Sequence, residues 1–336
     1  MRDDEGVRSH GGVRMKLPPQ LEPHARAYVL RLIEDGGKPL PQLSLEAARE
    51  VMRSAQTTPL EDSTVEVETL RHQGLQVTIV RPANSREALP AVLYLHGGGW
   101  VLGGVETHAR IVRELALRVR AAIVVPEYAL SPEARFPVAL EQCYKAAQWL
   151  EAEGGAYGID GTRVAVAGDS AGGNLAAALC LRSACSGGPK FRLQALLCPA
   201  LQASSANGSY REFADGLNLT QETMAWFWDQ YVPDAQQRLN PEVSPIHSDP
   251  ASLMRVAPAL IITAECDVLR DEGERYAQLL MEAGVEVTAL RFLGTLHNFL
   301  VIDALRESGP SVAALGVIAD RLGQSLHGKD VDERWG

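Results

Sequence analysis

A serine stands between small residues in the sequence Gly-Asp-Ser-Ala-Gly of residues 168–172. The apolar run 164–167 comes directly before this motif and a helical pattern follows over 174–181, so Ser170 is expected on a sharp turn from a strand into a helix. Such a turn presents the serine oxygen for attack, and small flanking residues leave room for it. We predict Ser170 as the nucleophile of an acyl transfer; the alternative is a serine that only caps the helix.

A second glycine-rich segment, His-Gly-Gly-Gly-Trp at residues 96–100, follows the apolar run 91–95. Consecutive glycines let backbone N–H groups point into a concavity, which suits a developing oxyanion. Ala171, the residue after the serine, supplies another N–H from a helix N-terminus. A phosphate-binding loop is disfavoured because no Lys-Ser/Thr pair follows and no G-x-G-x-x-G motif begins a helix.

The general base is predicted by elimination, because the order in such a site is serine, acid, histidine. Three histidines follow the serine, namely His247, His297 and His327. His247 falls in a segment with flanking prolines and His327 lies near a polar tail. His297 follows the predicted strand 285–292 by a short turn, residues 293–296, which is where a base carried on a loop belongs. We therefore predict His297 as the base.

The acid must lie between the serine and the histidine, just beyond a strand. The apolar run 259–263 is followed by Glu265 and Asp267, so Asp267 is the predicted acid and Glu265 the reserve. Asp271 is predicted instead to cap the helix 273–283, because Glu274 follows it at the spacing of a capping box.

The elements that position these residues are predicted from hydrophobic periodicity. Residues 21–55 have helical spacing, and the alternating runs 64–70 and 75–80 around a Gly-containing turn indicate a hairpin. From residue 90 onward, short apolar runs alternate with helical stretches, which indicates a mainly parallel sheet covered by helices on both faces. The predicted strands are 91–95, 122–125, 164–167, 195–198, 259–263 and 285–292.

One segment interrupts this alternation. Residues 202–249 contain no strong strand pattern but include an aromatic helix over 221–231, with Thr220 as its predicted N-cap. Its aromatic side chains either pack the helix onto the body or form a lid over a pocket; one helix can do both.

Composition limits the classes of function. Net charge is −10, which argues against nucleic acid as the main partner, and the apolar runs are too short to span a membrane. The five cysteines have no C-x-x-C pair and are expected to be buried thiols, with no metal site. Residues 1–20 lack the apolar core of a signal peptide and are expected to be a mobile extension, so a cytoplasmic location is predicted.

Together these motifs resemble the bacterial hormone-sensitive-lipase-like (family IV) esterases of the α/β-hydrolase superfamily. The likeness extends from about residue 70 to residue 303. It is carried by the following segments: 96–100 (HGGGW), 128–133 (YALSPE), 136–137 (FP), 168–173 (GDSAGG), 266–272 (CDVLRDE) and 297–299 (HNF).

The resemblance implies an α/β-hydrolase fold, with a mainly parallel eight-stranded sheet between helices and a helical cap. It implies an oxyanion hole on the N–H groups of Gly98, Gly99 and Ala171, and a substrate pocket is expected at Trp100, Trp226 and Phe227. The expected organisation comprises cap helices and extension in 1–60, a core of 61–201 and 250–326, a cap insertion of 202–249 and a polar tail of 327–336.

The implied function is hydrolysis of short- to medium-chain carboxylic esters through an acyl-enzyme, with no cofactor. Alternatives are a lactonase or amidase with the same triad, or a non-catalytic receptor for a small ligand. Pairing through an edge strand into a homodimer is also expected from the resemblance. Two residues depart from the family pattern. Ala129 replaces the usual arginine, which bears on a local ion pair, and Asn298 replaces the usual glycine, which bears on the mouth of the site.

Overall fold

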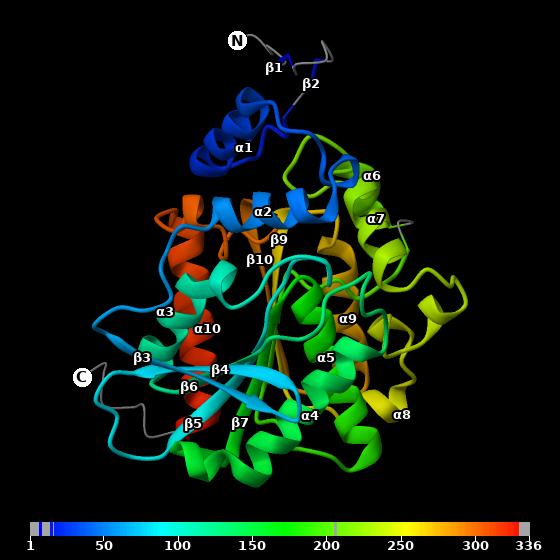
Figure 1. Cartoon of the computed structure of the whole chain (residues 1–336). Helices are drawn as coiled ribbons and strands as arrows, with labels where there is room; N and C mark the ends of the chain where they lie inside the picture. The colour runs from blue at the N-terminus through cyan, green and yellow to red at the C-terminus, as the bar shows by residue number, and fades with distance from the viewer. Residues whose placement is uncertain (1–6, 9–13, 16, 205–206, 329–336) are drawn as a thin grey trace, which may run out of the picture.

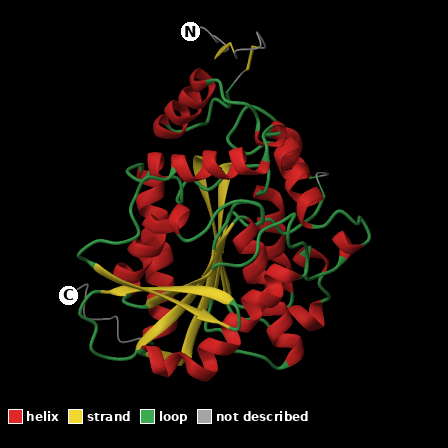
Figure 2. Cartoon of the chain, viewed as in Figure 1, coloured by secondary structure: helices red, strands yellow, loops and turns green. Residues whose placement is uncertain are grey.

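The computed structural model of the chain describes residues 7–8, 14–15, 17–204 and 207–328. Most of the predicted mobile extension and of the predicted polar tail lies outside these described residues. The described chain forms a central sheet with helices on both faces (Figures 1 and 2).

The sheet has eight strands in the order β10-β9-β8-β7-β5-β6-β4-β3. All neighbouring strands from β10 to β6 are parallel, and the hairpin of β4 and β3 is added antiparallel at one edge. This confirms the predicted α/β-hydrolase architecture, including the hairpin. The strands are β3 (Val65–His72), β4 (Leu75–Pro82), β5 (Leu89–Leu95), β6 (Ala122–Pro126), β7 (Ile159–Asp169), β8 (Gln194–Leu197), β9 (Ala259–Cys266) and β10 (Val287–Leu296), with a separate pair of β1 (Val7–Arg8) and β2 (Arg14–Met15).

Helices cover both faces of the sheet because the parallel strands are apolar on both sides. In Figure 1, α3 and α10 lie on one face and α4, α5 and α9 on the other. The body helices are α3 (Ala109–Val119), α4 (Val138–Glu153), α5 (Ala171–Ser186), α8 (Pro250–Leu253), α9 (Arg270–Glu282) and α10 (Gly309–His327).

The remaining helices lie over the carboxyl ends of the strands (Figure 1). Two come from the N-terminal segment and two from the predicted insertion, in which the described residues contain no strand. The four helices are α1 (Pro23–Asp35), α2 (Leu45–Ala55), α6 (Gly208–Glu212) and α7 (Gln221–Tyr231).

The order of the strands brings two predicted motifs together. After β5 the chain forms β6 on one side and then crosses to form β7 on the other, so β5 and β7 are neighbours. Loops that leave such a reversal point diverge and leave a crevice at the carboxyl ends of the strands. Residues 96–100 follow β5 and Ser170 follows β7, so both lie at the carboxyl ends of the two strands that meet at this reversal point.

Local predictions had mixed outcomes. The Thr220 side chain caps α7 by accepting a hydrogen bond from the Thr223 N–H, as predicted. The predicted cap at Asp271 is wrong, because α9 begins at Arg270 and the Asp271 carboxylate accepts from the Ser209 N–H instead. The predicted turn 293–296 is also wrong, because β10 continues through an irregularity to Leu296.

The five cysteines are free thiols. Four are buried as predicted, whereas Cys185 is exposed.

No helix among the described residues is both long and apolar enough to cross a membrane. Strands β10 and β3 form the two edges of the sheet, and pairing of two chains through such an edge stays a prediction.

Candidate active site

Ser170 lies on a tight turn between β7 and α5. Its backbone has a φ of 54° and a ψ of −117°, a conformation that costs free energy for a residue with a side chain. The turn fits only because its neighbours are glycines. A Cβ atom on Gly172 would overlap the carbonyl oxygen of Leu95, and one on Gly168 would overlap the carbonyl of Gly172. The motif thus folds as a nucleophile elbow.

A chain of hydrogen bonds links the three residues predicted for catalysis. His297 Nε2 lies 3.0 Å from Ser170 Oγ, and His297 Nδ1 lies 2.7 Å from Asp267 Oδ2. The exposed fractions are 6% for Ser170, 6% for His297 and 2% for Asp267, so little water competes for these bonds. The reserve acid Glu265 is directed elsewhere, accepting from the Gly294 N–H at 2.7 Å.

The glycine loop after β5 lies beside this chain. Gly98 and Gly99 have φ values of 108° and 62°, so their N–H groups point in directions that residues with side chains rarely allow. Across the described residues, no hydrogen bond is formed by the N–H groups of Gly98, Gly99 or Ala171. Donors without protein acceptors near a nucleophile could stabilise an oxyanion.

The Asp169 carboxylate joins the elbow to the glycine loop. Asp169 has no exposed surface and accepts hydrogen bonds from the Gly97 N–H at 3.0 Å and the Tyr94 hydroxyl at 2.8 Å. His108 Nε2 lies 3.3 Å from the same carboxylate. A Cβ atom at Gly97 would overlap Asp169, so the glycine is required for this close approach.

The pKa values of the two buried histidines beside this carboxylate shift in opposite directions. Burial by itself raises the pKa of Asp169, but the charge of His108 and the hydrogen bonds from His108 and Tyr94 outweigh it and lower the pKa. Burial would lower the pKa of His108, but the Asp169 carboxylate outweighs this effect and raises it. Burial and the charge of His108 lower the pKa of His96 to about 3. The Asp169 carboxylate thus favours the protonated form of His108, whereas His96 is held in its neutral form.

The insertion covers the glycine loop. The Phe227 ring of α7 lies directly on Gly99, where a Cβ atom would overlap it. Trp226 is half-buried and its ring centroid lies 5.1 Å from that of Phe227. Trp100 is fully buried and stacks on Tyr231, with ring centroids 4.5 Å apart, so in this structure Trp100 packs against α7.

The N-terminal segment also holds the loops around the site. Arg49 of α2 donates to the carbonyl oxygens of Val101 and Ser131 and forms an ion pair with Glu133. Glu133 therefore has a cationic partner although Ala129 replaces the arginine of the family pattern. The ion pair ties α2 to the loop between β6 and α4, and the bond to Val101 ties it to the segment that follows the glycine loop.

One group in the site has ligands suited to a metal ion. The ligand atoms of Cys198, Asp267 and His297 lie within 4.8 Å of one another. However, His297 Nδ1 and Asp267 are already joined by a short hydrogen bond. Burial, followed by the nearby Asp267 charge, raises the pKa of the Cys198 thiol well above its ordinary value, which favours the neutral thiol. The set therefore fits a hydrogen-bonded triad better than a resident metal.

Several polar contacts of this site were missed by sequence reasoning, including that of Asn298, which was expected to bear on the mouth of the site and is instead directed inward to Asp169. His108 and Asn298 reach Asp169 from other segments, and Asn218 of the insertion donates to the main-chain carbonyl of His297 at 2.9 Å. Asp169 itself lies within the serine motif, and a carboxylate at the end of an apolar strand is the signal that could have found it. No local pattern marks the partners that reach it.

Comparisons with known proteins found a matching family and several similar proteins. A family model described as the alpha/beta hydrolase fold matches residues 92–301. The chain is 34% identical to ethyl acetate hydrolase of Pseudomonas putida, over 91% of this chain and 99% of that protein. It is 36% identical to the carboxylesterase NlhH of Mycobacterium tuberculosis, over 81% and 88% of the two chains. The chain is also similar to the crystal structure of a thermostable esterase from Pseudomonas putida ECU1011, with a TM-score of 0.89 and 41% sequence identity. This match covers 92% of this chain and 98% of the esterase chain.

Proposed function

Because the chain belongs to the α/β-hydrolase family and is a carboxylic ester hydrolase of the hormone-sensitive-lipase-like branch, we propose that it cleaves esters through an acyl-enzyme on Ser170. The observation that carries this proposal is the buried chain of hydrogen bonds from Ser170 through His297 to Asp267, at 3.0 and 2.7 Å. A histidine held between a hydroxyl and a carboxylate can take the serine proton as the oxygen attacks.

The proposed reaction has two steps, acylation of the serine and hydrolysis of the acyl-enzyme. Ser170 Oγ bonds to the ester carbonyl carbon, its proton moves to His297 Nε2, and the carbonyl oxygen becomes an oxyanion. Acylation ends when the bond between the carbonyl carbon and the alcohol oxygen breaks, the carbonyl re-forms, and His297 protonates the departing alcohol. Water then attacks the acyl-enzyme with His297 again as base, which releases the carboxylic acid and restores the serine.

The three free N–H groups of Gly98, Gly99 and Ala171 are the proposed oxyanion hole. They lie at the ends of β5 and β7, next to the serine, and have no protein acceptor among the described residues. Removing one such donor typically raises the barrier by about 2.7–4 kcal/mol. Asp267 is proposed to hold the imidazole in the correct tautomer and to stabilise its cationic form.

Short to medium acyl chains are the proposed substrates. The Phe227 ring on Gly99 and the half-buried Trp226 beside it restrict the space above the proposed oxyanion hole, which supports the short end of this range. A series of p-nitrophenyl esters from acetate to dodecanoate measures the preference, and we expect kcat/KM to be highest at or below the hexanoate. A cytoplasmic location is part of the proposal, supported by the free cysteines.

Substitution of the nucleophile tests the proposal. Ser170→Ala is expected to leave the fold intact and to reduce ester turnover roughly 10³-fold or more, because the acyl-enzyme cannot form. Ser183→Ala is the matched control, since Ser183 is a buried serine on α5 whose hydroxyl has no hydrogen-bond partner in the described part of the chain. Turnover of Ser170→Ala close to that of the control would refute the proposal.

A further inference from the structure

Asn298 comes directly after His297 in the loop that follows β10. Its backbone has a φ of 54°, and its main-chain carbonyl accepts hydrogen bonds from the Val301 and Ile302 N–H groups. Its side-chain Nδ2 donates to Asp169 Oδ2 at 2.8 Å. The amide is therefore directed into the molecule, toward the residue that precedes the nucleophile.

Through this bond, one buried carboxylate contacts three segments of the site. Asp169 belongs to the elbow, it accepts from Gly97 of the glycine loop, and it accepts from Asn298 of the histidine loop. The proposed nucleophile, oxyanion donors and base thus lie on segments that meet at Asp169. A shift of the histidine loop relative to Asp169 would change the 3.0 Å separation of His297 Nε2 and Ser170 Oγ.

The backbone alone does not account for asparagine at this position. Asparagine tolerates a positive φ better than most residues, but glycine tolerates it at least as well. What asparagine adds is the hydrogen bond to a carboxylate that has no exposed surface. A hydrogen bond to a charged group is typically stronger than one between neutral groups.

We propose that Asn298 is a positioning residue for ester hydrolysis, which anchors the loop of His297 on Asp169 and so keeps the base in reach of Ser170. The inference rests on the proposed function. Because Asn298 acts on the position of the base, its loss lowers the rate of proton transfer. Ester binding depends on the glycine loop and the cap, so the effect falls on kcat rather than on KM.

Asn298→Gly tests this role because it keeps the positive φ and removes only the amide. We expect kcat to fall about tenfold and KM to stay within about twofold, since misplacement by about 1 Å can cost up to 10²-fold in rate. Asn298→Asp is expected to lower kcat more, about 100-fold, because it places a second carboxylate against Asp169. The matched control is Asn84→Gly, in the exposed turn after β4, where φ is 62°.

The rate of Ser170 labelling by diisopropyl fluorophosphate separates the outcomes, because it reports on the nucleophile and base without a bound ester. We expect slower labelling of Asn298→Gly than of Asn84→Gly at similar melting temperatures. Equal labelling rates and equal kcat would overturn the inference, and so would a lower melting temperature with an unchanged labelling rate. Wild-type protein that is neither labelled nor active would instead overturn the proposed function. If Asn298→Asp does not fold, the comparison of the two glycine variants decides.

Discussion

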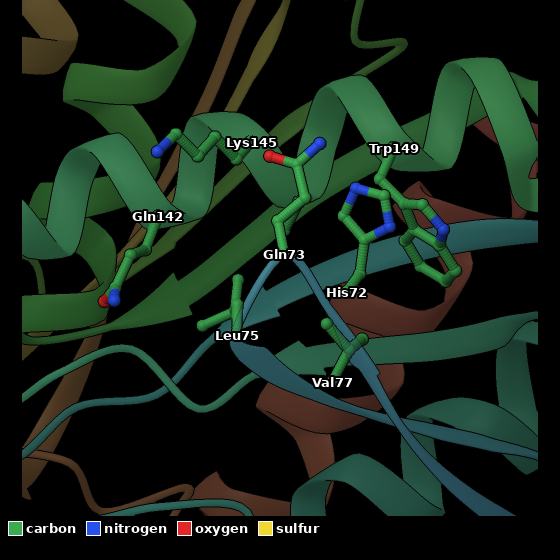
Figure 3. Close-up of a pocket in the computed structure, with 8 residues that line it drawn as sticks. His72, Gln73, Leu75, Val77, Gln142, Lys145 and Trp149 are labelled. Atoms are coloured by element: carbon green, nitrogen blue, oxygen red, sulfur yellow. The ribbon is translucent and has the colours of Figure 1, made fainter.

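Two histidines of this chain lie in very different surroundings. His297, at the carboxyl end of the sheet, is held on both ring nitrogens by Ser170 and Asp267. His72, at the end of the β3–β4 hairpin, lies beside a cavity of about 70 Å³ between the hairpin and α4. Figure 3 shows the side chains that line this cavity, among them His72, Gln73, Leu75, Val77, Gln142, Lys145 and Trp149.

The difference lies in the connections of each histidine. The His72 ring packs against Trp149 with 5.9 Å between ring centroids, and across the described residues its ring nitrogens form no hydrogen bond. His297 is nearly fully buried, and the carboxylate of its partner Asp267 also accepts from the Leu269 N–H at 3.0 Å. A histidine acquires a role in catalysis when its tautomer and position are fixed, and the hairpin does not provide this.

The largest expected effect separates these two histidines directly. His297→Ala is expected to reduce kcat/KM for a p-nitrophenyl ester roughly 10³-fold or more, because the base is removed. His72→Ala is expected to keep kcat/KM within about twofold of wild type. Comparable losses in the two variants would erase the distinction between the regions.

The second expected effect concerns the carboxylate on which the active-site segments meet. Asp169→Ala removes the buried carboxylate that faces His108. Loss of one partner from a buried charged pair typically lowers the free energy of unfolding by about 3–5 kcal/mol, and we expect a loss of this size here. Urea denaturation measures this loss. A matched change at an exposed ion pair, Glu50→Ala beside Arg53, is expected to cost at most about 1 kcal/mol. A loss at Asp169 no larger than this control would show that the buried pair contributes little.

The smallest expected effect is a dependence of stability on pH. Burial lowers the pKa of His108, but the Asp169 carboxylate outweighs this effect and raises it. The folded state therefore binds the imidazole proton of His108 more tightly than the unfolded state does. Its stabilising contribution is complete below the ordinary histidine pKa of about 6.5 and is lost as pH rises through the raised value. The difference in unfolding free energy between wild type and His108→Gln should therefore shrink above pH 6.5. A difference that grows with pH would contradict the ion pair.

The sequence predicts groups that a motif or a local interaction marks, and it misses groups whose partners come from distant segments. Ser170, Asp267 and His297 could be predicted as a set because motif, chain order and the ends of strands restrict the choice. The structure brings their side chains within hydrogen-bond distance, and their catalytic role stays a prediction. Thr220 was predicted because a helix cap is a local interaction. Asp271 was mispredicted because a tertiary contact, the Ser209 N–H, takes its carboxylate.

The polar contacts around Asp169 were beyond the reach of sequence patterns. His108 and Asn298 lie 61 and 129 residues from Asp169 in the chain. No periodicity or motif relates residues so far apart. His108 follows the loop after β5 and Asn298 lies in the loop after β10, and only the tertiary fold brings both to the end of β7. The supporting contacts of a site are therefore harder to predict than its reactive groups.

Mass spectrometry of protein quenched during turnover of p-nitrophenyl acetate tests the acyl-enzyme most directly. We expect a mass increase of one acetyl group, located on the peptide that contains Ser170 and absent from Ser170→Ala. Ester hydrolysis with the acetyl group located on another residue, or with the same adduct in Ser170→Ala, would contradict the account.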